Sequence, residues 1–186
     1  TPDAAPTRSR FGDLFAIAFG MAMTLAVQGY QFGTSNHTVY LLDPLRRAFP
    51  GTLARDWFTS QTLQYHALFG LISAWLYEVG IIEWAFLASY LILTLLLNVA
   101  WLMIVRAVGG SILSFVLSVV LFNISAGGNG LGVYQFMQAS SMLPSNVSNV
   151  AMLWGIALWM TGRGAWAGIA LGFAGLFHLN HAIAGA

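Results

Sequence analysis

Residues 84–105 read WAFLASYLILTLLLNVAWLMIV, an uncharged run of 22 residues that ends at Arg106. A helix of about 20 apolar residues crosses the hydrocarbon core of a bilayer, which is roughly 30 Å thick. The rest of the chain has the same character, because 58% of its 186 residues are hydrophobic and only 7% are charged, with a mean hydropathy of +0.75. So little polar surface excludes a soluble globule of this size. The sequence predicts an all-α, polytopic transmembrane helix bundle.

Further apolar runs lie on both sides of this stretch, and together they predict a single transmembrane domain over residues 1–186. The expected segments are a cytoplasmic arm at 1–10, a first span at 14–32, an outer loop at 33–83, and further spans at 84–105, 111–124, 148–161 and 165–184. The arm carries Arg8 and Arg10 directly before the first span. Because positive residues stay on the cytoplasmic side, the N-terminus is expected inside.

The segment 62–79 leaves two topologies open, because it is apolar enough to cross but contains polar residues. If Arg106 and Arg163 are cytoplasmic, Glu78 and Glu83 lie outside, and the segment dips into the outer face without crossing. This arrangement has five spans. A six-span alternative places all four charged residues against the positive-inside rule, so the five-span topology is preferred.

The outer loop is expected to contain a short helix over residues 40–49. Leu41, Leu42 and Leu45 recur there at helical spacing, while Asp43 belongs to an opposite, charged face. The segment is too short and too charged to span a bilayer. It is therefore predicted to lie flat at the interface with its leucines buried in the apolar layer.

Polar residues converge on the outer side in this topology. The candidates are Asn36, His37, Asp43, Asp56, His66, His178 and His181. His178 and His181 share a helix face, where an ionisable side chain needs water or a partner. The sequence predicts one pocket that joins the loop around Asp56 to these two histidines. The structural alternative is that each histidine bonds a neighbouring helix and that Asp43 only pairs with Arg47.

Other features limit the possible functions. The chain has no cysteine, which excludes disulfides and thiolate metal sites, and its net charge of +1 offers no basic surface for nucleic acid. No complete set of metal ligands can be recognised. Gly164, Gly168 and Gly172 form a row on the last span and are expected to allow close helix packing.

Three stretches carry a resemblance to a known family. They are QGYQFGTSNHTVYLLDPLRRAFPGTLARDWF at 28–58, QYHALFGLI at 64–72 and LPSNVSNVAMLWGIALWMTGRGAWAGIALGFAGLFHLNHAIAG at 143–185. Their order resembles the N-terminal half of the GT-C superfamily of membrane glycosyltransferases, and in particular the bacterial GT-C-like integral membrane proteins.

The resemblance implies transfer of a sugar from a polyprenyl-phosphate donor at the outer face of a bacterial inner membrane. It implies that Asp56, or failing that Asp43, serves the acceptor as a base or positions it. Asn36, His37, His66, His178 and His181 would then contact the substrate; no metal ligand is assigned. A divalent cation, Mg²⁺ or Mn²⁺, would stabilise the leaving phosphate of an active enzyme.

The chain also departs from this family. It has about half of the expected spans, and its outer loop at 126–147 contains no carboxylate. These departures favour a fragment or a reduced, inactive relative. The alternative is a non-catalytic accessory subunit of a larger respiratory or photosynthetic membrane complex, in contact with membrane lipids and other subunits. A transporter is a weaker alternative, because no internal repeat or pair of broken helices is visible.

Overall fold

The computed structural model describes residues 9–34, 36–61, 66–126 and 139–178, and these residues contain helices and no strand. The helices are α1 Arg10–Gln28, α2 His37–Tyr40, α3 Leu42–Ala48, α4 Trp57–Gln61, α5 Ala67–Val79, α6 Ile82–Ala107, α7 Ile112–Ala126, α9 Pro144–Met160 and α10 Gly164–Phe177. The predicted all-helical class is therefore confirmed.

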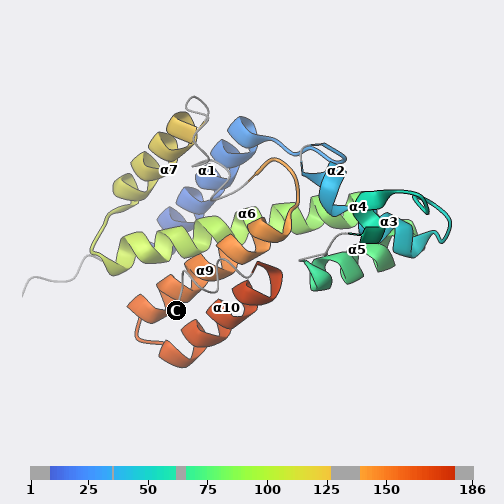
Figure 1. Ribbon diagram of the computed structural model, residues 1–186. Coiled ribbons are helices and arrows are strands. Elements are labelled where there is room, and N and C mark those ends of the chain that lie inside the picture. The colour runs from blue at the N-terminus through green and yellow to red at the C-terminus, as the bar shows by residue number, and fades with distance from the viewer. Residues whose placement is uncertain (1–8, 35, 62–65, 127–138, 179–186) are drawn as a thin grey trace, which may run out of the picture.

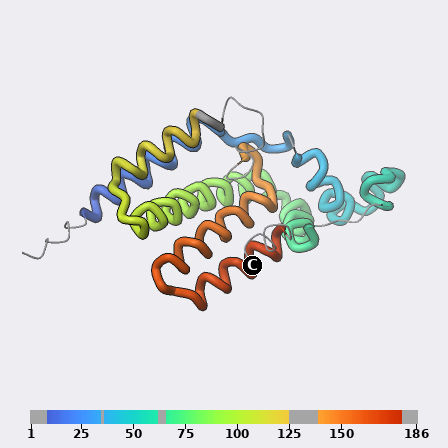
Figure 2. Tube along the Cα trace, turned by 60° about the vertical axis from the view of Figure 1, so that its left-hand side comes forward, coloured from blue at the N-terminus to red at the C-terminus, as the bar shows by residue number. Residues whose placement is uncertain are grey.

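The long helix α6 is the centre of the bundle. Helices α1 and α7 pack together along one side of it, and the pair α9 and α10 lies along another (Figures 1 and 2). The short helices α2 to α5 gather around the beginning of α6 (Figure 1). We call this part of the molecule the loop end and the opposite part the far end.

Contacts between helices fix which termini share an end. At the far end, Arg106 Nη2 at the end of α6 lies 2.7 Å from Asp13 Oδ1 in the first turn of α1. At the loop end, the ring of His37 packs against Phe86, with ring centroids 5.5 Å apart. Glu83 is one turn from Phe86 on α6, so Glu83 and His37 lie at the same end of the bundle.

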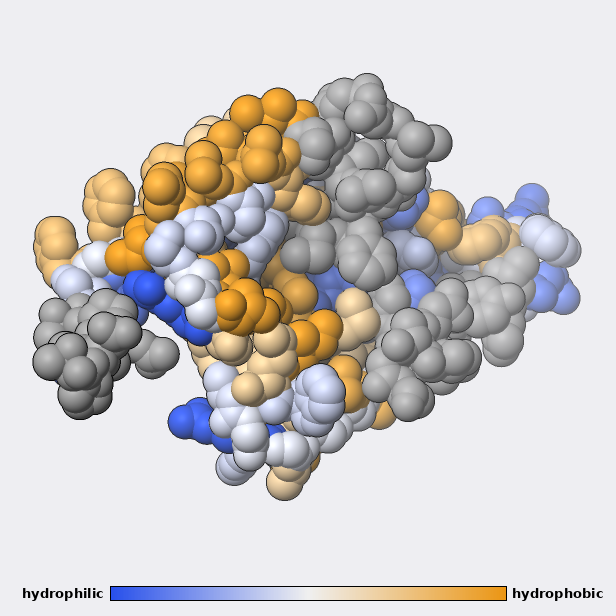
Figure 3. Space-filling model, turned by 90° about the vertical axis from the view of Figure 1, so that its left-hand side faces the viewer, coloured by the Kyte–Doolittle hydropathy of each residue, from blue (hydrophilic) through white to orange (hydrophobic). Residues whose placement is uncertain are grey.

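The bundle buries polar residues and exposes apolar ones. Thr94, Asn98, Asn123 and Asn149 are each at most 2% exposed. In contrast, large apolar side chains are exposed on the outward faces of several helices, including Leu113, Leu117, Leu121 and Ile124 on α7, Trp166, Ile169 and Leu176 on α10, and Trp84 and Ile92 on α6. Figure 3 shows hydrophobic residues over much of the upper surface and hydrophilic residues in separate patches. Contiguous exposed apolar surface of this kind indicates an interaction with a membrane or a partner.

Within the described residues, two helices are long and apolar enough to cross a membrane, namely α1 with 19 residues and α6 with 26. Helix α5 has 13 residues, which gives a length of about 20 Å and is too short to cross roughly 30 Å of hydrocarbon. Helices α7 and α10 are also apolar but shorter than a full span. The five-span arrangement therefore stays a prediction.

Close packing between α1 and α6 depends on Gly20. A Cβ atom added at Gly20 would overlap the side-chain amide of Asn98, so a larger residue requires the Asn98 side chain or a helix to move. The predicted packing role of the glycine row on α10 is not found within the described part of the chain. A Cβ added at Gly164, Gly168 or Gly172 meets nothing within 4 Å, because this face of α10 is exposed.

Most of the predicted helix at 40–49 is present as α3, and α2 ends at Tyr40, so that the two helices meet at Leu41; its position at a membrane interface stays a prediction. Pro44 causes this break, because it has no N–H to bond the carbonyl of Tyr40. The expected orientation of α3 is wrong for Asp43, which is 3% exposed and faces Gly70 of α5. Leu41 is buried in the protein core, whereas Leu42 and Leu45 are half-buried; their predicted burial in the apolar layer of a membrane is not tested. Helix α3 therefore packs on α5 through a face that includes its carboxylate.

Candidate functional site

His37 begins α2 and is held at both of its ring nitrogens. The backbone N–H of Gly33 donates to Nδ1 at 3.0 Å. Because Nδ1 accepts this hydrogen bond, the proton is on Nε2, which donates to the carbonyl of Met142 at 2.7 Å. The side chain is 2% exposed and packs edge-on against Phe32 and Phe86. This environment fixes one neutral tautomer.

The surroundings of His37 also favour its neutral form. Burial lowers the pKa of the imidazole below its ordinary value of 6.5, and the hydrogen bond to Met142 offsets part of this effect. Protonation would moreover place a second donor on Nδ1, directly opposite the N–H of Gly33. His37 is therefore arranged as a neutral structural group.

His66 makes a second hydrogen bond of the same kind. It directly precedes α5, and its Nδ1 lies 2.9 Å from the carbonyl of Phe177. Its ring packs edge-on against the ring of Tyr40, with centroids 5.0 Å apart. It also contacts the ring of His178, with centroids 5.2 Å apart. Tyr40 on α2, His66 before α5 and His178 after α10 thus form one aromatic cluster.

The two histidines together connect the loop end to the C-terminal helices. His37 reaches Met142, 105 residues later, just before α9. His66 reaches Phe177, 111 residues later, at the end of α10. Each contact satisfies a backbone carbonyl near a helix end. The two hydrogen bonds therefore fix the short helices against α9 and α10.

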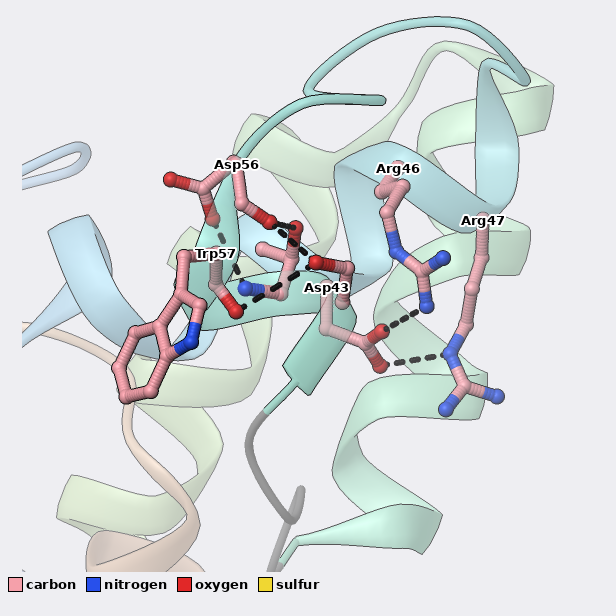
Figure 4. Close-up of polar contacts among 7 residues, drawn as sticks. Asp43, Arg46, Arg47, Asp56 and Trp57 are labelled. Atoms are coloured by element: carbon pink, nitrogen blue, oxygen red, sulfur yellow. Dashed lines mark hydrogen bonds and ion pairs between the residues drawn. The ribbon is translucent and has the colours of Figure 1, made fainter.

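Asp43 is neutralised by two arginines from the next turn of its own helix. Its Oδ1 accepts from Arg46 Nη2 at 3.1 Å, and its Oδ2 accepts from Arg47 Nε at 2.6 Å (Figure 4). The carboxylate is buried while both guanidinium groups are partly exposed. Both carboxylate oxygens are thus engaged in ion pairs. The structural alternative of pairing with Arg47 is found, with Arg46 as a second partner.

Asp56 caps the short helix α4. Its Oδ2 accepts a hydrogen bond from the backbone N–H of Thr59 at 2.8 Å, which is the usual geometry of an N-cap carboxylate (Figure 4). Its carbonyl accepts from the hydroxyl of Ser60 at 2.7 Å. The other carboxylate oxygen makes no hydrogen bond with any residue that the structure describes. Asp56 as a whole is half-buried.

The structure brings together only part of the predicted pocket. His66 and His178 are in contact, and His37 lies at the same end of the bundle. Asn36 is exposed, with its carbonyl accepting from Val39 and Tyr40. Asp43 pairs with the arginines of α3, and Asp56 bonds Thr59 and Ser60 of α4. Among the described residues, no hydrogen bond or ion pair joins either carboxylate to a histidine. His181 lies outside the described residues.

No group of three histidine or carboxylate side chains that could hold a metal ion occurs in residues 9–34, 36–61, 66–126 and 139–178. Sequence reasoning also missed the partners of the two histidines. Both are backbone carbonyls, at Met142 and Phe177. Every residue has a backbone carbonyl, so residue type does not reveal which one accepts a hydrogen bond. Gly33 is likewise used through its backbone.

Comparison with known proteins identifies no relative of this chain. No family model, no curated protein and no solved structure matches it.

Proposed function

We propose that the chain is a multi-pass protein of a bacterial inner membrane, with its loop end outside and its N-terminus inside. Within this proposal α1, α6, α7, α9 and α10 cross, and α5 enters the outer leaflet only. The apolar outer surface and the polar interior support it, since polar groups in membrane helices face the interior of the bundle.

Within that membrane, the chain acts as a non-catalytic subunit of a larger assembly. One observation carries this conclusion: the side chains best placed for chemistry are already bonded within the chain. His37 is bonded at both nitrogens, and Asp43 is paired with two arginines. A group that moves a proton needs a free lone pair or proton within reach of the substrate. These side chains instead make the loop end rigid.

The open glycine row on α10 supports the same proposal. Gly164, Gly168 and Gly172 have no neighbour within 4 Å of an added Cβ. Rows of small residues let a second helix approach closely in a membrane, where packing drives association. A helix of another subunit fits this face.

Gly168→Leu tests the assembly. In mild detergent, the wild-type chain should elute in a larger particle and the Leu variant as a single folded chain, because the new side chain meets nothing in its own chain. Gly168→Ala is the matched control and should keep the larger particle. The proposal would be contradicted by a wild-type chain that elutes from detergent as a single folded chain and is also monomeric in native membranes.

Sugar transfer is the second candidate, and the free oxygen of Asp56 favours it. That oxygen makes no hydrogen bond with the described residues, so it could accept the proton of an acceptor hydroxyl while Oδ2 caps α4. Asp56→Asn should then lower turnover by about a hundredfold or more, with a polyprenyl-phosphate sugar and Mg²⁺ or Mn²⁺ supplied. The fold should be kept, because asparagine caps helices as well as aspartate does. Undiminished turnover in the Asn variant would exclude Asp56 as the base.

A further inference from the structure

The turn between α9 and α10 stops short of the far end of α6. Helices α6 and α9 both run from the loop end towards the far end, and the indole N–H of Trp154 on α9 donates to the carbonyl of Leu96 on α6 at 3.1 Å. These two residues therefore lie at a similar level. From there α9 runs only about 9 Å further, to Met160, whereas α6 runs about 15 Å further, to Arg106. Figures 1 and 2 show the same offset.

Helix α10 returns from this turn to the loop end in only 14 residues, which is about 21 Å. The structure describes both of its ends: Arg163 precedes it, and the carbonyl of Phe177 in its last turn accepts a hydrogen bond from His66 at the loop end. An ordinary hydrocarbon layer is roughly 30 Å thick. Arg163 is exposed, and a charged side chain is unfavourable in hydrocarbon. The polar boundary beside α10 is therefore closer to the loop end than the boundary beside α6.

Exposed tryptophans mark the two boundaries of this surface. Trp84 lies in the first turn of α6 at the loop end, while Trp159 and Trp166 flank the α9–α10 turn, and the three are 75%, 72% and 64% exposed. Exposed side chains between these levels include Ile92 and Ile169, which are aliphatic. Tryptophan rings collect at the headgroup level of a bilayer, and aliphatic side chains face its interior. This order along the helices indicates that lipid covers the surface.

We propose that the α9–α10 turn thins the bilayer beside it from the cytoplasmic side, and that the chain therefore selects lipids with short acyl chains. A flat bilayer of ordinary thickness would bury Arg163, Trp159 and Trp166 in hydrocarbon, so the headgroups approach them and the layer becomes thinner there. The proposal rests on the membrane location proposed above and on neither of the two activities. A partner helix on the glycine row is compatible with it, because Trp166 lies about 160° around α10 from Gly168.

Bilayers that differ only in acyl-chain length test this proposal. The full chain is placed in nanodiscs of monounsaturated phosphatidylcholines with 14 to 22 carbons per chain, and its melting temperature is measured in each. Lipids with 18 carbons form a hydrocarbon layer of ordinary thickness, roughly 30 Å. The wild-type chain should have its highest melting temperature at 14 or 16 carbons. This temperature should fall by about 4–8 °C at 20 carbons, because stability decreases with each ångström of mismatch.

A triple variant removes the polar boundary at the turn, by combining Arg163→Leu with Trp159→Leu and Trp166→Leu. All three side chains are exposed, so the fold should be kept. The highest melting temperature should move to 18 carbons or more, because the apolar surface beside α9 and α10 becomes longer. Arg10→Leu is the matched control, since it removes another exposed arginine at the far end but away from this turn. It should keep the preference for 14 or 16 carbons.

The outcomes separate the thinning from the membrane location. A wild-type melting temperature that is highest at 18 carbons or more, or that does not depend on chain length, would overturn the thinning and leave the membrane location intact. A triple variant with the same preference as the wild type would overturn it as well. Release of the wild-type chain from discs of every lipid would contradict the membrane location itself, and the thinning with it.

Discussion

Neutral histidine side chains hold the loop end in place. An imidazole has one donor and one acceptor only in its neutral form, and His37 uses both, for Met142 and Gly33. The carbonyl of Met142 is buried with its residue, so it depends on this partner. A residue predicted to touch substrate therefore has a structural role that only its neutral state can perform.

Acidification should destabilise the protein through His37. Burial lowers the pKa of its folded-state imidazole below 6.5, so in acid the unfolded chain binds a proton before the folded chain does. The contribution of His37 to the free energy of unfolding should be constant above about pH 7.5. It should decrease as the pH falls through 6.5 towards the folded-state pKa. Denaturation in detergent between pH 8 and pH 5 measures this dependence.

His37→Phe is the control for this measurement. It keeps a ring between Phe32 and Phe86 but leaves the carbonyl of Met142 without a donor, which should cost about 1–3 kcal/mol at pH 8. The difference in the free energy of unfolding between wild type and variant should shrink as the pH falls, because only the wild type loses the contribution of His37. The other histidines titrate in both proteins, so their contributions cancel. A difference that is constant from pH 8 to pH 5 would show that His37 is not held neutral.

At the level of helices, the sequence predicts where a helix forms better than which of its faces is buried. The apolar runs predict α1, α6, α9 and α10 near their observed positions, since a run of uncharged residues has few alternatives to helix in this composition. The rotation of α3 was not predictable in the same way. Asp43 is charged, and burial of a charge depends on Arg46 and Arg47 and on the space opposite Gly70. Spacing alone assigns it to the exposed face.

Two glycine-to-alanine changes should have opposite effects. Gly20→Ala places a methyl group against the buried side chain of Asn98, which should displace that side chain or separate α1 from α6 and cost about 1–3 kcal/mol. Gly168→Ala meets nothing and should be neutral or stabilising by up to about 1 kcal/mol, because alanine favours helix more than glycine does. Thermal unfolding of both variants in one detergent checks this. Equal destabilisation by the two changes would contradict the observed α1–α6 packing.

Charge is divided unequally between the two ends of the whole molecule. The far end has Arg10, Arg106 and Arg163 with Asp13, whereas the loop end has Arg46, Arg47 and Arg55 with Asp43, Asp56, Glu78 and Glu83. The far end is therefore net positive and the loop end net negative. This division agrees with a far end in the cytoplasm.

The candidate site was only partly predictable, because hydrogen bonds from His37 and His66 to distant carbonyls depend on how the whole bundle closes.

Labelling of single cysteines should establish the orientation of α6, since the natural chain has none. Glu83 is exposed at the loop end, and Val108 is 69% exposed at the far end. Glu83→Cys should react with a membrane-impermeant maleimide in intact cells, whereas Val108→Cys should react only after lysis. The two positions flank the uncharged run 84–105 of α6, so a crossing helix must give opposite results for them. Labelling at Val108→Cys alone would reverse the proposed orientation, and labelling at both positions in intact cells would show that α6 does not cross the membrane.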